Sequence, residues 1–99
     1  MDSKLYERLI KDFVEKDTTQ ETLFTGLSSE VGEVLGERVK ETRNGLERST
    51  EILDELGDVL WYITVISASR GSSLGQLMIN NYYKLEQRKI NGKVKNNDT

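Results

Sequence analysis

Apolar residues in this chain recur at intervals of three and four, which is the spacing of one face of an α-helix. The pattern predicts four helices, at about residues 3–16, 19–43, 51–70 and 74–90. The run VLWYITVI, from Val59 to Ile66, has the composition of a β-strand. However, the helical periodicity that enters this run begins at Ile52 and extends well beyond the length of a strand, so we predict a buried helix.

Polar residues and glycines mark the expected helix ends. Thr18 and Ser73 are each followed three residues later by Glu or Gln, which is the capping-box pattern at the start of a helix. The pair Asn44–Gly45 is a strong turn signal, and Gly71 fits the position just after the end of a helix. These signals agree with the helix boundaries that the apolar pattern predicts.

Three glycines interrupt the second predicted helix, namely Gly26, Gly32 and Gly36. In a helix interior each glycine costs about 1 kcal/mol relative to alanine. We therefore expect either a break near Gly26 or close approach of another helix at Gly32 and Gly36.

The chain of 99 residues has room for one domain with a small core. We expect an all-α fold, a bundle of four or five helices, as a single domain over residues 1–92 with a flexible C-terminal tail at 93–99. A chain of this length buries only about 65% of the surface that it exposes when unfolded. We therefore expect the bundle to assemble as a homo-oligomer.

The sequence lacks residue types that many metal sites and catalytic sites require. The sequence has no cysteine and no histidine, which excludes thiolate and imidazole metal sites, nucleophilic cysteines and histidine bases. Carboxylates are then the strong metal ligands that remain, and they favour hard cations such as Mg²⁺ or Mn²⁺. The net charge of −3 argues against a nucleic-acid partner. The N-terminal segment MDSKLYERLIKD has no apolar leader, and no apolar run could span a bilayer, so we expect a cytoplasmic protein without a membrane partner.

Two groups of acidic residues have the spacing of one helix face. Glu30 and Glu33 are three residues apart in the second predicted helix, as are Glu55 and Asp58 in the third. Both groups border apolar positions, so they would lie at the edge of the core and would meet if the two helices pack antiparallel. One further acid extends each group by a turn and is a candidate auxiliary ligand, Glu37 and Glu51 respectively.

Like charges brought together in this way repel each other, and a bound divalent cation would remove the repulsion. Mg²⁺ prefers oxygen ligands and usually keeps some of its waters, which leaves positions for substrate phosphates. The alternative is that the acids form a solvated helix face and pair with neighbouring cations. Spacing alone leaves both interpretations open.

The segments GLSSEVGEV and EILDELGDVLWYITVISA resemble the paired ExxE and ExxD motifs of the MazG-like, all-α nucleoside triphosphate pyrophosphohydrolases. The motifs are here Glu30-x-x-Glu33 and Glu55-x-x-Asp58, and the resemblance extends over residues 23–88. It implies that the four acids bind Mg²⁺ and act in catalysis. It also implies hydrolysis of nucleoside or deoxynucleoside triphosphates to the monophosphate and pyrophosphate, by attack of a metal-activated water on the α-phosphate.

The resemblance further implies residues that bind the substrate. Lys84 and Arg88 lie one helical turn apart in NNYYKLEQRK and resemble the cations that hold phosphate oxygens. Tyr62 resembles an aromatic that some relatives place against the base or sugar, and Asn81 is a further candidate contact. Exposed helix cations without a function and a core tyrosine are the alternatives at these positions.

Many members of the family form dimers or tetramers in which a neighbouring subunit completes the pocket, and we favour a tetramer for this chain. The preferred base and sugar stay open. Two other functions also stay open: hydrolysis of a guanosine alarmone at the same metal site, and a non-catalytic helical interaction or regulatory module.

Overall fold

The computed structural model describes residues 1–92. In chain order they form α1 (Ser3–Ile10), the 3₁₀ segment η1 (Lys11–Phe13), α2 (Gln20–Asn44), α3 (Ser49–Ser69) and α4 (Leu74–Ile90). The described residues contain no strand, so the prediction of an all-α fold is confirmed. The tail predicted at 93–99 lies outside the described residues, and the single domain over 1–92 stays a prediction.

The helix ends follow the local sequence signals with three exceptions, one of which is that α3 begins at Ser49, two residues before its predicted start, without a side-chain cap from Arg48. The Ser73 hydroxyl accepts a hydrogen bond from the Gln76 N–H at the start of α4, as its capping box predicts. At α2 the cap is Thr19 and not Thr18. The first helix ends at Ile10, earlier than its apolar spacing predicts. The chain then passes through η1 into extended backbone at Val14.

Gly26 is a point of close contact between α2 and α3. Contrary to expectation, α2 runs through Gly26 without a break, and nothing lies close to the positions that a side chain at Gly32 or Gly36 would occupy. The ring of Tyr62, on α3, lies directly against Gly26, where a Cβ atom would overlap it. The glycine that permits a close approach is therefore the one for which we expected a break.

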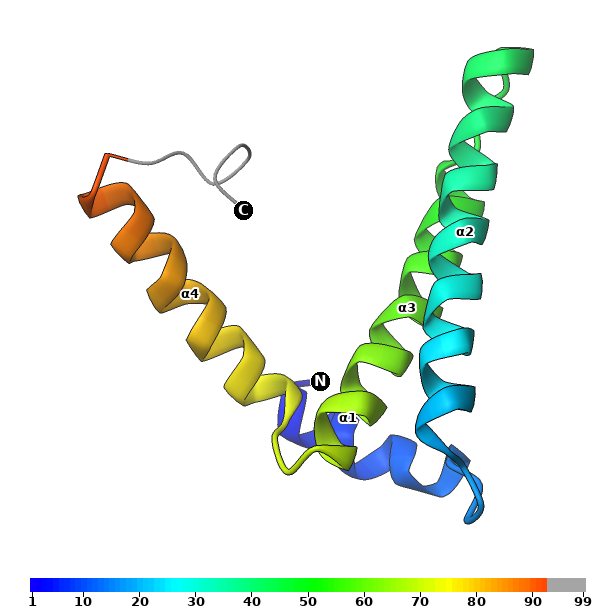
Figure 1. Cartoon of the computed structure of the whole chain (residues 1–99). Helices are drawn as coiled ribbons and strands as arrows, with labels where there is room; N and C mark the ends of the chain where they lie inside the picture. The colour runs from blue at the N-terminus through cyan, green and yellow to red at the C-terminus, as the bar shows by residue number, and fades with distance from the viewer. Residues whose placement is uncertain (93–99) are drawn as a thin grey trace.

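α2 and α3 form an antiparallel hairpin, and α1 crosses its base (Figure 1). The turn between them begins at Gly45, whose left-handed backbone (φ +64°) closes α2. Leu23 on α2 and Val65 on α3 are the buried apolar side chains among the described residues. The core of a single chain is thus a small region near the base of the hairpin.

α4 leaves the same base and diverges from the hairpin, so the described chain has the shape of a V (Figure 1). The start of α4 is fixed to α1 by a hydrogen bond of 3.0 Å from the Gly75 N–H to Glu7 Oε1. The radius of gyration is 16.1 Å, whereas a compact domain of this length has about 13 Å. Only α2 and α3 pack along their lengths, so one chain by itself does not form the predicted bundle.

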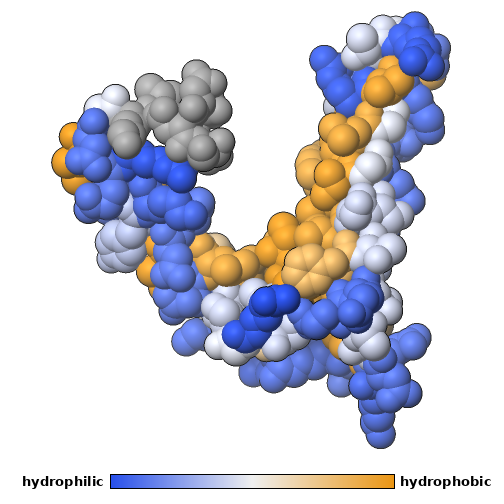
Figure 2. Space-filling view, viewed as in Figure 1, coloured by the Kyte–Doolittle hydropathy of each residue, from blue (hydrophilic) through white to orange (hydrophobic). Residues whose placement is uncertain are grey.

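An apolar surface follows the hairpin and the base on the inside of the V, as Figure 2 shows. Leu35 on α2 and Leu53 on α3 are 61% and 67% exposed, and Met78 and Tyr82 on α4 are similarly exposed. The chain exposes 7734 Å², whereas a compact monomer of 11.3 kDa would expose about 5,700 Å². Much of the apolar surface that the sequence provides for a core therefore faces solvent in one chain. Over the described residues, no helix has both the length and the apolarity needed to cross a membrane.

Candidate metal centre

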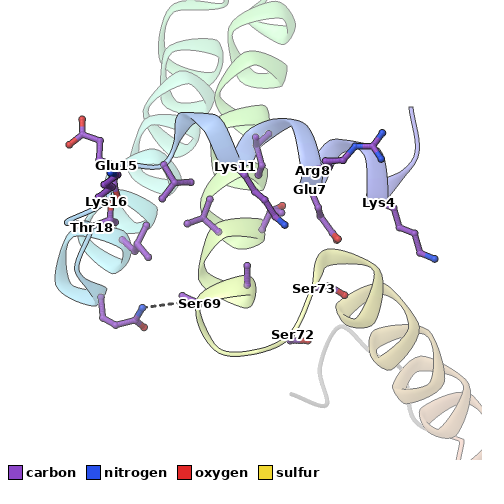
Figure 3. Close-up of a pocket in the computed structure, with 17 residues that line it drawn as sticks. Lys4, Glu7, Arg8, Lys11, Glu15, Lys16, Thr18, Ser69, Ser72 and Ser73 are labelled. Carbon is purple, nitrogen blue, oxygen red and sulfur yellow. Dashed lines mark hydrogen bonds between the residues drawn. The ribbon is translucent and has the colours of Figure 1, made fainter.

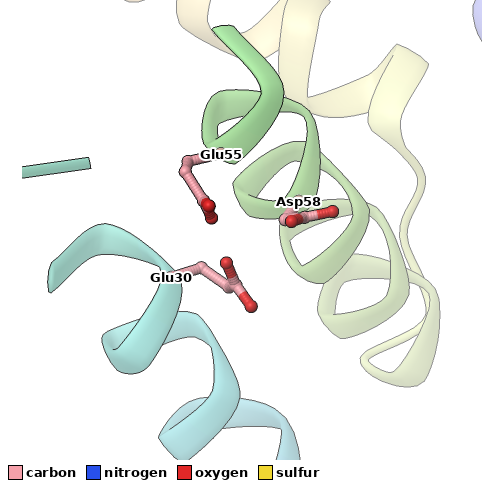
Figure 4. A group of neighbouring side chains, drawn as sticks. All are labelled: Glu30, Glu55 and Asp58. Atoms are coloured by element: carbon pink, nitrogen blue, oxygen red, sulfur yellow. The ribbon is translucent and has the colours of Figure 1, made fainter. Parts of the chain in front are cut away.

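The antiparallel packing of α2 and α3 brings together three acidic side chains, Glu30 from α2 and Glu55 and Asp58 from α3 (Figure 4). One carboxylate oxygen from each residue lies within 4.8 Å of the others. Glu55 and Asp58 share a face of α3 because they are three residues apart, and the hairpin places Glu30 opposite them. The facing of the two acidic groups, expected from their spacing, is therefore present.

Two of these carboxyl groups have an oxygen that is buried and lacks a partner. Glu30 Oε2 and Glu55 Oε2 are inaccessible to solvent, and neither has a hydrogen-bond donor within the described part of the chain. Ionised carboxylates only accept hydrogen bonds, so two that face each other cannot satisfy one another. A proton or a cation between them can. A cluster that offers only oxygen ligands, with Asp58 open to solvent, fits a hard divalent cation such as Mg²⁺ or Mn²⁺.

The acids also change one another's protonation. Hydrogen bonding with the carboxyl groups of Glu33 and Glu30 raises the pKa of Glu55 to about 7, and burial adds to this shift. Burial raises the pKa of Glu30, and the neighbouring charges of Glu33 and Asp58 raise it further. The structure brings Glu30, Glu55 and Asp58 together. The exposed Glu33 lies near enough to raise the pKa of Glu30 and Glu55.

The two candidate auxiliary ligands, Glu37 and Glu51, instead form ion pairs with basic side chains at the tip of the hairpin. Arg48 Nε donates to Glu37 Oε2 at 2.8 Å, and Lys40 Nζ lies 3.1 Å from Glu37 Oε1. Hydrogen bonds from Arg48 and Lys40 lower the pKa of Glu37. Glu51 lies 4.0 Å from Arg48 Nη1. Both acids take part in ion pairs beyond the cluster of Glu30, Glu33, Glu55 and Asp58.

The four predicted substrate-binding residues lie in two separate places. Tyr62 follows Asp58 by one turn of α3, and its ring packs on Gly26 and edge-on to Trp61, with centroids 4.9 Å apart. The other three are on the diverging helix α4, which separates them from the carboxylates of the same chain (Figure 1). They are Asn81, Lys84 and Arg88.

Sequence reasoning missed Tyr6, on α1. Burial raises the pKa of its phenol, and the charge of Asp58 raises it further, so the side chain lies in the field of the acidic cluster. In the sequence Tyr6 is one more residue on the apolar face of a short amphipathic helix. Nothing in that pattern indicates that the charge of Asp58 acts on this residue.

A cavity of about 740 Å³ lies elsewhere, between α1, the start of α2 and the C-terminal part of α3 (Figure 3). Leu23 and Val65 contribute to its lining. Several of its polar groups already have partners within the chain; the Glu7 carboxylate, for example, binds the Gly75 N–H. The cavity contains none of the predicted site residues, so we assign the chemistry to the carboxylates and not to the larger hollow.

The raised pKa of Glu55 predicts how the stability of the metal-free protein depends on pH. The folded state keeps a proton on Glu55 up to about pH 7, whereas the unfolded chain releases it near the ordinary value of 4.5. The free energy of unfolding should therefore fall as pH rises from about 4.5 to about 7. Urea denaturation with chelator across this range measures the slope, which Glu55→Gln should reduce. Stability that is flat or rises with pH in the wild type would contradict the shared proton. Saturating Mg²⁺ should reverse the loss, since the cation replaces the proton.

Comparison with known proteins identifies the family of the chain. A family model described as the MazG nucleotide pyrophosphohydrolase domain matches residues 18–92, which include both acidic motifs and α4. No match was found among curated proteins or among solved structures. The resemblance carried by the paired motifs is confirmed, and α1 lies outside the matched range. The chain belongs to the MazG nucleotide pyrophosphohydrolase family.

Proposed function

We propose that the protein hydrolyses nucleoside or deoxynucleoside triphosphates to the monophosphate and pyrophosphate and that it requires Mg²⁺, for which Mn²⁺ can substitute. The observation that carries this proposal is the convergence of Glu30, Glu55 and Asp58, with two buried oxygens that lack donors. A solvated acidic face, the alternative from sequence, would keep its carboxylates apart and hydrated. Membership of the family supports a nucleotide substrate.

In this proposal Glu30, Glu33, Glu55 and Asp58 hold the cation and act in catalysis. When bound, Mg²⁺ would neutralise phosphate charge, lower the pKa of the attacking water and stabilise the leaving group. The water oxygen forms a bond to the α-phosphorus, and the bond from that phosphorus to the bridging oxygen of the β-phosphate breaks, which releases pyrophosphate. We assign Glu33 as the acceptor of the water's proton, because its exposed side chain lies near Glu55 but outside the group of three carboxylates that converge.

Lys84 and Arg88 are proposed to bind substrate phosphates, with Asn81 and Tyr62 as further substrate contacts. Because α4 diverges from the hairpin, these cations would act on the carboxylate cluster of a neighbouring subunit. The exposed apolar inner surface supports the homo-oligomer that this requires, and we favour a tetramer over a dimer.

The activity is tested by incubating the protein with the common nucleoside and deoxynucleoside triphosphates and a guanosine alarmone, with Mg²⁺, and separating the products. We expect monophosphate and pyrophosphate, with kcat/KM lowered at least about a hundredfold by Glu55→Gln or Asp58→Asn. Glu21→Gln, an exposed acid on α2 outside the cluster, is the matched control and should retain activity. Turnover of the alarmone alone would replace the proposed substrate. No turnover with either Mg²⁺ or Mn²⁺ would favour a non-catalytic module.

The shared site is tested by mixing two inactive variants. Glu55→Gln lacks an acid but keeps the cations, and the double variant Lys84→Ala/Arg88→Ala has the reverse defect. If one subunit supplies the acids and another the cations, joint refolding should restore about a quarter of the wild-type activity, because mixed oligomers contain intact sites. Unmixed variants refolded in the same way are the control. No recovery would mean that the acids and cations act within one chain. Full activity in the double variant alone would show that Lys84 and Arg88 do not belong to the site.

A further inference from the structure

The tip of the α2–α3 hairpin contains a network of charges centred on Arg48, the residue directly before α3. Its Nε atom donates to Glu37 Oε2 at 2.8 Å, and its backbone N–H donates to Glu41 Oε2 at 2.9 Å. Lys40 Nζ binds the other oxygen of Glu37 at 3.1 Å. Arg48 therefore contacts α2 through its side chain and its backbone, at two acids one helical turn apart.

These contacts are more protected than ordinary surface ion pairs. The Arg48 side chain is 27% exposed and that of Glu37 is 14% exposed. By contrast, Arg38, which pairs with Glu41 within α2, is 67% exposed. An exposed pair contributes little because water and salt screen it, whereas a half-buried, hydrogen-bonded pair that joins two helices resists their relative movement.

The network has a fixed relation to the carboxylate cluster. Glu37 follows Glu30 by seven residues, and Arg48 precedes Glu55 by seven. Seven residues are about two turns, or roughly 10 Å, along each helix. In an antiparallel hairpin, the register that pairs Glu37 with Arg48 is therefore the one that sets Glu30 opposite Glu55. A slip of one helix by a turn would lose both pairings.

Before a metal binds, the pairing of Glu30 with Glu55 and the pairing of Glu37 with Arg48 have opposite effects on the packing of α2 against α3. Carboxylates that face each other between α2 and α3 repel and favour a hairpin that slides or opens. The pairing of opposite charges at the tip favours the observed register. At the base, Tyr62 packed on Gly26 fixes the other side of the cluster. The acids thus lie between two contacts that hold the helices together.

We infer that Arg48, through its pairing with Glu37, is a positioning residue that sets the register of α2 and α3 and so assembles the carboxylate cluster before the divalent cation arrives. The inference builds on the proposed metal site and concerns its affinity for metal, not the hydrolysis step. Arg48 does not touch the cation or the substrate. Its loss weakens cation binding, because part of the binding energy must then restore the register.

The test measures Mn²⁺ binding to the full chain, without nucleotide, by electron paramagnetic resonance of the free ion. We expect Arg48→Ala to raise the Kd for Mn²⁺ about tenfold, with helical content by circular dichroism unchanged. Arg48→Lys keeps the charge and should recover part of the affinity. Arg38→Ala is the matched control, since it removes an ion pair to Glu41 without disconnecting the helices, and its Kd should equal that of the wild type.

Glu37→Gln removes the same pairing from the other helix, and it replaces Arg48→Ala if that variant does not fold. It should weaken Mn²⁺ binding to the same extent. In the hydrolysis assay, either variant should raise the Mg²⁺ concentration needed for half-maximal rate while kcat at saturating Mg²⁺ stays near wild type.

An unchanged Kd in Arg48→Ala and Glu37→Gln, or an equal loss in Arg38→Ala, would overturn the inference and leave the proposed hydrolase intact. If both variants bind Mn²⁺ more weakly but the wild-type protein hydrolyses no nucleotide, the inference is supported and the proposed function is rejected. A wild-type chain that binds no Mn²⁺ would reject both.

Discussion

The constraint that dominates this structure is electrostatic repulsion, because the packing of α2 on α3 brings carboxylates from both helices close together. Glu30 and Glu55 each bury an oxygen that no donor in the described chain satisfies, and protonation of Glu55, whose pKa is raised to about 7, relieves part of the repulsion. A helix pair designed only for stability would have apolar residues at these positions. Keeping acids there makes physical sense if a divalent cation occupies the cluster, as we propose.

The same hairpin explains why one chain is incomplete. Its small core lies at the base, an apolar surface follows the hairpin on the inside of the open V, and α4 exposes apolar side chains of its own. Because α4 carries Lys84 and Arg88 away from the acids, an oligomer would bury the apolar surface and supply cations to the cluster at once. In this account assembly and catalysis depend on the same contact, so loss of one should remove the other.

Sequence predicted what depends on local spacing and missed what depends on packing. The helices, the Ser73 cap and the pairing of the two acidic motifs follow from residues three or four apart. The fit of Tyr62 on Gly26 joins residues far apart in the chain, so the glycine alone suggested a break. The divergence of α4 is set by the turn between Gly71 and Ser73 and by its contact with α1, which no motif records.

Whether the carboxylate cluster binds metal is tested most directly by the position of bound Mn²⁺ in crystals grown with that ion, located by anomalous diffraction. We expect a peak between α2 and α3, within about 2.5 Å of carboxylate oxygens from Glu30, Glu55 and Asp58. Glu55→Gln crystals prepared in the same way should show a weaker peak or none. A peak at the ion pairs of the hairpin tip, or none near the four acids at saturating Mn²⁺, would contradict the claim that this cluster is a metal site.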